Sequence, residues 1–305
     1  MPFEFAPISR GWFPLRIAIA AESGEGKTLS AVKLAVGLAG NNPEKVYFAD
    51  TDNERGRFYA DLYAPKRINY LSFPPPHSPA RFGEVIAAAE QRNAEVLVID
   101  CASDEWEGVG GCADLAEKDK GSWLRPKNQH FLKFMTRASH SNMHIIFTLI
   151  VKPVGMPDKD KEKAVKRTPA KFANRDFGLV CEKSFMRPMT LGIFVSDKGR
   201  RTEVYKVFEG LKPTADKITG AITEQHGFIL RQWVEGLSVP DIEVEKAKTA
   251  LKTASVEGMA KLQEVRRTIS DDILRKVGGQ LLSELKAAAE EFDKQREGAN
   301  NGEKT

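Results

Sequence analysis

The feature that most constrains the fold is a short stretch near the N-terminus, Ala21-Glu22-Ser23-Gly24-Glu25-Gly26-Lys27-Thr28. It follows an apolar run over 15–20 and precedes a segment of small and apolar residues over 29–40. Strand, glycine-containing loop and helix, in this order, form the context in which a G-x-x-x-x-G-K-[ST] match binds phosphate. Only the first glycine differs, and alanine is tolerated there if its backbone stays extended. The stretch therefore predicts a phosphate-binding loop between a strand and a helix.

Each part of this loop has an expected role. The loop N–H groups and the N-terminus of the following helix direct positive dipole ends toward one point. Lys27 adds a positive charge at the β- and γ-phosphates, and the Thr28 hydroxyl can ligate Mg²⁺. A chance glycine-rich turn would not also place a strand, a Lys-Thr pair and a helix in register. We expect nucleotide contacts from Ser23, Gly24, Glu25, Gly26, Lys27, Thr28 and Leu29.

The length and composition of the chain exclude several classes of protein. The chain has 305 residues, which suggests one large or two modest domains, and 29% charged with 41% hydrophobic residues indicates a globular protein. The net charge of +4 is mild, so any contact with nucleic acid must come from a local patch. Three cysteines without a C-x-x-C pair argue against a disulfide framework and against a zinc site. With no signal-peptide pattern and no membrane-length apolar run, we expect a cytosolic protein with no membrane partner.

The next segments predict an α/β fold with acids at strand ends. We expect strands over 45–50 and 68–73, and a helix from Ser78 to about Arg92. The apolar run 95–99 ends in Asp100, a Walker-B pattern in which this carboxylate holds Mg²⁺ directly or through water. A lone apolar strand ending in Asp is common, but one that follows a phosphate-binding loop is specific.

The middle of the chain continues the alternation. Residues 102–125 are expected to be a loop, 126–140 a helix and 143–151 a strand, with further strands within 177–207. Strands that alternate with helices predict a mostly parallel sheet flanked by helices. The stretch 152–172 has seven basic residues against three acids, a surplus of four that equals the net charge of the whole chain, and its composition predicts disorder.

The C-terminal part differs from the rest. Beyond a boundary near 236–240, apolar residues recur at helical spacing, with an interruption at Gly278-Gly279. We expect an α/β core over 1–236, a small helical domain over 241–295 and a disordered tail over 296–305.

Taken together, residues 15–210 resemble the RecA-fold ATPases encoded by phages, including single-strand annealing and recombination proteins. The resemblance rests on the phosphate-binding loop, Asp50-Thr51-Asp52, Val98-Ile99-Asp100, the segment Glu105 to Gly111, the helix with Asn128 and His130, the strand 144–148, and Lys198-x-Arg200. It implies a RecA-like core that hydrolyses ATP with Mg²⁺ and binds single-stranded DNA. The resemblance also implies a homo-oligomer, either a ring or a filament, and a single-strand-binding protein as a further partner. It implies that the protein acts in the cytoplasm of the host cell.

The resemblance also implies roles for individual residues. The carboxylate that activates water falls on Asp52, one methylene shorter than the usual Glu, with Glu54 as its substitute. Lys198 and Arg200 match an element that reaches into the ATP site of a neighbouring subunit, although a basic β-turn explains them by composition alone. Thr148 matches a γ-phosphate sensor or is a buried strand threonine.

Two segments fall where RecA-like proteins place DNA-binding loops. The first is 152–172, with a flexible linker as the alternative, and the second is 105–111, with a glycine-rich turn as the alternative. The expected DNA-binding residues of the first segment are Lys159, Lys161, Lys163, Lys166, Arg167 and Lys171.

Specific residues argue against two other classes of nucleotide-binding protein. The chain lacks an Asn-Lys-x-Asp motif, which argues against a GTPase, and Cys101 rather than Glu follows Asp100, which argues against an AAA+ machine. A small-molecule kinase, an assembly or motor NTPase with a protein client, and a nucleotide-binding switch with little hydrolysis remain open.

Overall fold

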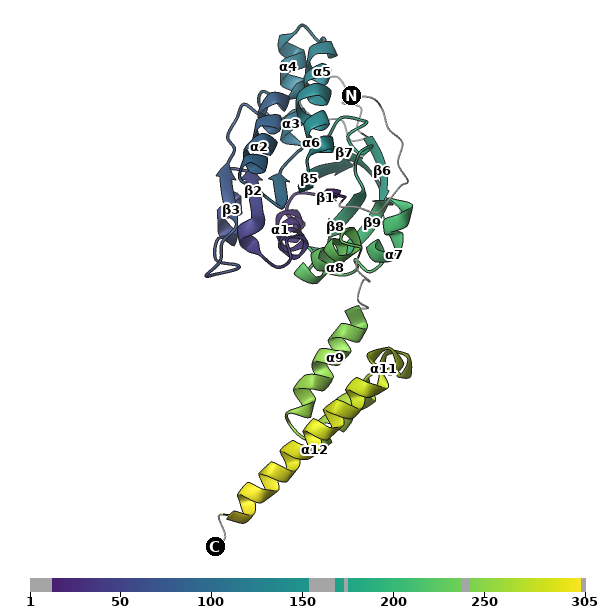
Figure 1. Cartoon of the computed structure of the whole chain (residues 1–305). Coiled ribbons are helices and arrows are strands. Elements are labelled where there is room, and N and C mark those ends of the chain that lie inside the picture. Colours follow the sequence, from purple (N-terminus) through teal and green to yellow (C-terminus); the bar gives the residue numbers. More distant parts are fainter. Residues whose placement is uncertain (1–12, 154–167, 173–174, 237–241, 303–305) are drawn as a thin grey trace, which may run out of the picture. The chain divides into compact units, whose positions relative to one another are not determined.

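The computed structural model describes residues 13–153, 168–172, 175–236 and 242–302 (Figure 1). The chain divides into two compact units, 1–238 and 239–305, each described here by itself.

The first unit is built on a sheet of nine strands in its described part. Seven of them run in the order β3-β2-β4-β5-β1-β8-β9. The first six strands in this order are parallel to one another, and β9 is antiparallel to β8. These strands are β1 (Arg16–Ala21), β2 (Val46–Asp50), β3 (Asn69–Ser72), β4 (Val96–Asp100), β5 (His144–Pro153), β8 (Leu191–Ser196) and β9 (Arg201–Val207). An antiparallel ribbon of β6 (Thr168–Phe172) and β7 (Arg175–Leu179) extends the end of β5. The predicted mostly parallel α/β sheet flanked by helices is confirmed.

Helices cover both faces of this sheet (Figure 1). The α-helices are α1 (Lys27–Leu38), α2 (Pro79–Gln91), α3 (Asp104–Glu107), α4 (Cys112–Lys118), α5 (Leu124–Gln129), α6 (Thr136–His140), α7 (Lys212–Ala215) and α8 (Glu224–Val234). A π-helical turn, η3 (His130–Met135), joins α5 to α6, and the 3₁₀ turns are η1 (Pro43–Lys45), η2 (Arg55–Tyr59) and η4 (Glu209–Leu211).

The side chains of β1 show how the two faces are separated. Ile17 and Ile19 pack with α1 and α8 in one core, and Ala18 and Ala20 pack with α2 and η3 in the other. This alternation follows from the two-residue period of a strand. All six residues of β1 are buried, as expected for a central strand of a parallel sheet covered on both faces.

Two sequence predictions for the first unit differ from the structure. Residues 102–125, predicted to be a loop, contain α3, α4 and the start of α5. These helices are too short to show a clear apolar period, so their pattern resembles that of a loop. The segment 152–172, predicted to be disordered, includes the end of β5 and all of β6, while its residues 154–167 lie outside the described part of the chain.

The second unit contains the helices α9 (Ile242–Ser255), α10 (Met259–Thr268), α11 (Asp271–Val277) and α12 (Gly279–Gly302). Buried Leu251, Leu262 and Leu285 belong to its small core. The Asp293 carboxylate accepts the Met259 N–H at 2.9 Å, which fixes the start of α10 against α12. The helix α12 continues to Gly302, past the point where we expected a disordered tail. In the described part of the chain, every helix is too short or too polar to cross a bilayer.

The start of β5 is held by two buried basic side chains. His144 Nδ1 accepts the backbone N–H of Leu15 at 2.9 Å, and Arg16 Nη1 donates to the Met143 carbonyl at 2.9 Å. Burial, with the positive charges of Arg16 and Arg231 nearby, lowers the pKa of His144 from its ordinary 6.5 to about 3. The folded protein therefore keeps this imidazole neutral.

This depressed pKa predicts a loss of stability in mild acid. Below pH 6.5 the unfolded chain binds a proton at His144 and the folded chain does not, so the free energy of unfolding falls as pH drops toward 3. The slope from this group is up to about 1.4 kcal/mol per pH unit. His144→Asn keeps a side-chain acceptor and removes the titration. Urea denaturation at several pH values should show a steeper fall for the wild type than for the variant, and parallel curves would contradict the assignment.

Candidate active site

The phosphate-binding loop joins β1 to α1 as the sequence predicts. Ala21 is the last residue of β1 and is therefore extended, the conformation that an alanine tolerates at this position. Gly24 and Gly26 have φ of 82° and 81°, which L side chains rarely adopt. The helix α1 begins at Lys27, and no side chain of the described residues caps its N-terminus. Its first N–H groups are thus available to a ligand.

Lys27 and Thr28 both contact the carboxylate of Asp100. Lys27 Nζ lies 3.1 Å from Asp100 Oδ1, and the Thr28 hydroxyl donates to Oδ2 at 2.5 Å. Burial is the largest single effect and opposes the charge on Lys27, but Asp100, with smaller contributions from Cys101 and Asp52, outweighs it in sum and raises the pKa of the lysine. The lysine therefore stays positive. The structure brings together the loop and the Walker-B aspartate, which are far apart in sequence.

The same contacts leave room for a hard cation. Adjacent oxygens on an octahedral Mg²⁺ lie about 3.0 Å apart, given Mg–O distances of about 2.1 Å. The hydroxyl of Thr28 and Oδ2 of Asp100 would need to separate by only about 0.5 Å to share such an ion, starting from their 2.5 Å contact. A looser, water-mediated bond to Asp100 would need a further movement. The pair fits Mg²⁺ in either arrangement.

Strand β5 lies between β4, which carries Asp100, and β1, which leads into the loop. Thr148 of β5 is fully buried, and its hydroxyl donates to Asp100 Oδ1. The aspartate thus receives hydrogen bonds from α1 on one side and from β5 on the other. Thr148 therefore positions the carboxylate of Asp100.

The carboxylates after β2 have different environments. Asp50 is buried and accepts the N–H groups of Asp52 and Gly56, both at 2.7 Å, so it fixes the turn that follows β2. The side chain of Asp52 is 48% exposed and pairs with Arg55 at 3.3 Å, yet it still contributes to raising the pKa of Lys27. Of the two acids expected to activate water, Asp52 therefore lies on the side of the loop lysine.

Glu54 is the less suitable of these two acids. It has φ of 63°, its side chain is 47% exposed, and it pairs with Arg57 at 2.9 Å. This pairing directs the carboxylate toward η2.

A further acid, Asp104, was missed by the sequence analysis. It begins α3, and its carboxylate accepts a hydrogen bond from the Thr51 hydroxyl. Burial raises the pKa of Asp104, and the nearby carboxylates of Asp52 and Asp100 raise it further. Because residues 102–125 were expected to be a loop, nothing in the pattern marked Asp104. Its only sequence signal is its position four residues after Asp100.

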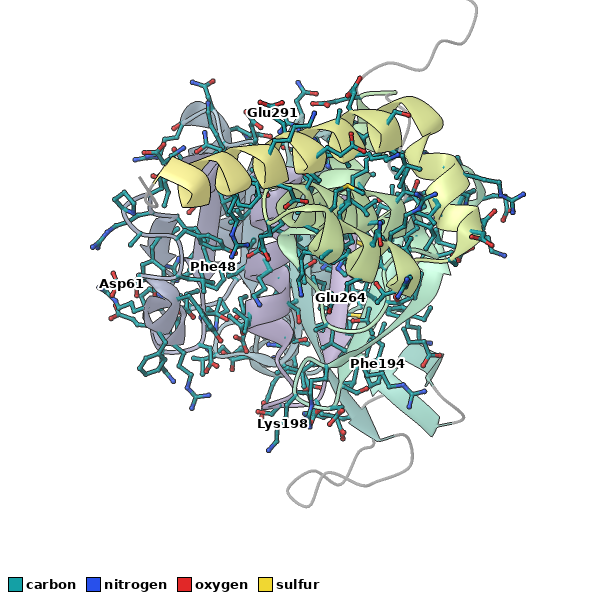
Figure 2. All side chains as sticks on the ribbon, turned by 90° about the horizontal axis from the view of Figure 1, so that it is seen from below. Phe48, Asp61, Phe194, Lys198, Glu264 and Glu291 are labelled. Atoms are coloured by element: carbon teal, nitrogen blue, oxygen red, sulfur yellow. The ribbon has the colours of Figure 1, made fainter. Side chains whose placement is uncertain are left out.

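The β8–β9 turn lies against the loop of its own chain. The Lys198 N–H donates to Glu25 Oε2 at 2.9 Å, and a Cβ on Gly26 would lie 2.9 Å from Gly199 Cα. The Lys198 side chain is exposed at this turn (Figure 2), and Arg200 folds back onto Asp197 at 2.7 Å. The turn backbone therefore lies beside the phosphate-binding loop of its own chain, and a role of Lys198 and Arg200 in the ATP site of a neighbouring subunit stays a prediction.

Most of the expected DNA-binding residues lie outside the part of the chain that the structure describes. Lys159, Lys161, Lys163, Lys166 and Arg167 lie outside the described residues, and Lys171 is placed only as a member of β6. Lys152 at the start of this segment pairs with Glu107 at 2.6 Å. The DNA-binding role of this segment stays a prediction.

The contact between turn and loop can be tested with two alanine variants. Gly24→Ala and Gly26→Ala meet the same backbone penalty, since both residues have φ near 80°. Only the methyl group at 26 would strike the turn, because a Cβ at 24 has no atom within 4 Å. Without nucleotide, Gly26→Ala should lose roughly 1–3 kcal/mol more stability than Gly24→Ala. Equal melting temperatures for the two variants would show that the turn does not rest on the loop.

Comparison with models of known protein families and with curated protein sequences gives no match for this chain.

Proposed function

We propose that this protein is a RecA-like ATPase that binds Mg-ATP and single-stranded DNA and acts in phage-type recombination, annealing or replication. The observation that carries the proposal is the contact of one buried carboxylate, Asp100, with both Lys27 and Thr28. A lysine, a hydroxyl and a carboxylate at the N-terminus of a helix are the groups that a triphosphate with Mg²⁺ requires.

Binding of ATP would rearrange these groups only slightly. The triphosphate would form an ion pair with Lys27, whose ammonium group pairs with Asp100 in the structure. Asp100 and Thr28 would then hold Mg²⁺, which supplies charge neutralisation at the β- and γ-phosphates. Thr148 would keep the carboxylate in place from β5.

Hydrolysis needs a carboxylate that orients and deprotonates water. Asp104 and Asp52 both lie near Asp100, and they influence one another electrostatically. Asp104 is the better base, because its hydrogen bond from Thr51 fixes it, and burial raises its pKa toward the operating range of a general base. Asp52, which is about half exposed and paired with Arg55, serves better to position the turn after β2.

The β8–β9 turn supplies the remaining positive charge. Because its backbone rests on the loop, Lys198 and Arg200 would reach the triphosphate of their own chain. Arg200 must first leave Asp197 to do so. A homo-oligomer on DNA remains part of the proposal, and the basic segment 152–172 would provide its phosphate contacts.

A nucleotide-binding switch is the second candidate function. It is favoured by the arginine partners of Asp52 and Glu54, which occupy the acids first expected to activate water. The two functions differ in whether ATP is turned over at all.

The proposal is tested by ATP hydrolysis with and without single-stranded DNA. We expect the wild type to hydrolyse ATP faster when single-stranded DNA is present. Asp104→Asn should lower the rate by roughly 10²–10⁴-fold, the usual contribution of a general base. The matched variant Asp52→Asn should lower it by less than about tenfold.

Nucleotide affinity and melting temperature serve as controls, because both substitutions are nearly isosteric and should leave them close to wild type. An ATP hydrolysis rate that single-stranded DNA does not change would favour an NTPase with a protein client. ATP binding without hydrolysis would favour the nucleotide-binding switch. Either result would contradict the proposed DNA-dependent ATPase. A larger loss in Asp52→Asn than in Asp104→Asn would reverse the assignment of the base.

A further inference from the structure

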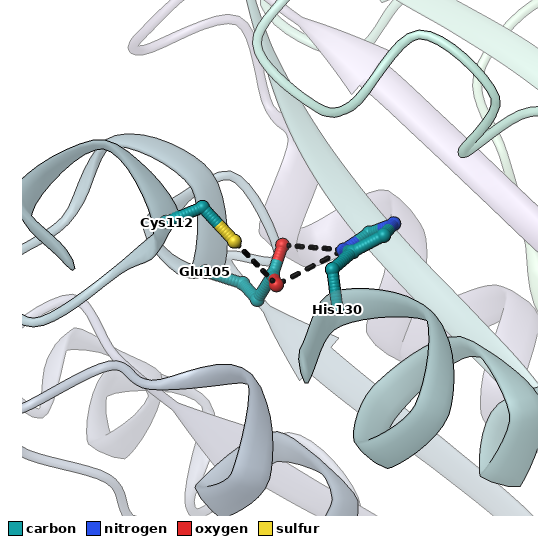
Figure 3. Close-up of side chains that lie close together, drawn as sticks. All are labelled: Glu105, Cys112 and His130. Carbon is teal, nitrogen blue, oxygen red and sulfur yellow. Dashed lines mark hydrogen bonds and ion pairs between the residues drawn. The ribbon is translucent and has the colours of Figure 1, made fainter. Parts of the chain in front are cut away.

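Three buried side chains of different chemistry meet above the sheet. Glu105 lies in α3, Cys112 begins α4 and His130 begins η3, and none is more than 1% exposed. Their side chains point toward one another from three separate helical segments (Figure 3). A carboxylate oxygen, a sulfur and an imidazole nitrogen thereby lie within 4.8 Å of one another.

We propose that Glu105, Cys112 and His130 bind one divalent transition-metal ion, for which zinc is the best match. Zinc accepts thiolate, imidazole and carboxylate ligands together, whereas Mg²⁺ and Ca²⁺ take oxygen ligands. The site is separate from the phosphate-binding loop and does not depend on the proposed function.

The distances suit a shared tetrahedral ion. Ligand atoms on one zinc lie about 3.3–3.6 Å apart, given Zn–N and Zn–S distances of about 2.0 and 2.3 Å. His130 Nδ1 lies 3.0 Å from both carboxylate oxygens of Glu105, and Cys112 Sγ lies 3.3 Å from Oε1. Two of the three separations thus need to change by only a few tenths of an ångström. The third, between sulfur and nitrogen, needs to shorten by at most about 1.3 Å from its 4.8 Å limit.

The electrostatics of the cluster also favour a cation. Glu105 is buried, and among the described residues the only basic partner it has is His130, which is charged only when protonated. A second buried carboxylate, Glu182, acts on Cys112 electrostatically. A buried carboxylate without a full positive charge is costly. A divalent ion with one thiolate, one carboxylate and one neutral imidazole gives a net charge of zero.

Binding the metal requires one proton to leave. In the structure the Cys112 S–H donates to Glu105 Oε1. The metal takes the place of that proton, which passes to solvent, and the sulfur binds as thiolate. His130 binds through Nδ1 as neutral imidazole, so no oxidant or reductant is needed.

The position of the cluster indicates what the ion would do. Glu105 and Cys112 lie on α3 and α4, which have four and seven residues, and isolated helices of fewer than about 12 residues are marginal in water. His130 lies in the longer helical run formed by α5, η3 and α6. A metal bound to all three would fix them to each other. The buried setting, with Trp106 and Phe134 beside His130, indicates a structural role. The three residues stand at positions 105, 112 and 130, a spacing outside the C-x-x-C pattern on which the sequence argument against a zinc site rests.

The test is metal content and cobalt spectroscopy on the full chain, produced without a histidine tag. After incubation with zinc and removal of excess, the wild type should hold about one zinc per chain and melt at a higher temperature than after chelation. With Co²⁺ it should show the near-ultraviolet absorption of a thiolate-to-cobalt charge transfer. This band reports sulfur ligation in the wild-type protein and needs no variant.

Three cysteine variants locate the sulfur. Cys112→Ser should lose the cobalt band and the stabilisation by zinc, while Cys101→Ala and Cys181→Ala, which change the other two buried cysteines, should keep both. The Cys101 variant also separates this site from cobalt bound near Asp100. Absence of zinc and of the cobalt band in the wild type would overturn the proposal and leave a metal-free hydrogen-bonded cluster. A band that survives in Cys112→Ser would overturn it equally.

Discussion

The arrangement of the first unit depends on the carboxylate of Asp100. It receives hydrogen bonds from Thr28 at the start of α1 and from Thr148 on β5, and it pairs with Lys27. These contacts cross three adjacent strands, because β5 separates β4 from β1. A buried carboxylate is stable only with such partners, and here the partners are the groups that a triphosphate and Mg²⁺ would use. Under the proposed function, the stability of the folded chain and its affinity for nucleotide depend on the same residues.

Much of the fold follows from local pattern. The continuous apolar runs of β1, β4 and β5 identify buried parallel strands, and the loop between β1 and α1 is marked by its glycines and by Lys27. The short helices α3 and α4 could not be predicted, because elements of four and seven residues carry too little periodicity.

Some residues of the candidate site were predictable from local motifs, and others were not. Lys27, Thr28 and Asp100 belong to motifs with fixed spacing, so their positions were predictable. Asp104 and the turn at Lys198 enter the site only through tertiary packing, which joins α3 to Thr51 and the β8–β9 turn to Glu25. The same holds for Cys112, whose neighbours Glu105 and His130 come from other segments. Long-range contacts of this kind leave no periodic signal in a single sequence.

The most direct test of the account is calorimetric binding of Mg-ATP to the wild type, to Lys27→Ala and to Lys33→Ala, a matched lysine on the same helix α1. Loss of a charge-assisted contact should cost about 1.5–3 kcal/mol, or roughly 10- to 150-fold in affinity. The account predicts this loss in Lys27→Ala and near wild-type binding in Lys33→Ala. A folded Lys27→Ala protein that binds Mg-ATP as tightly as the wild type would contradict it.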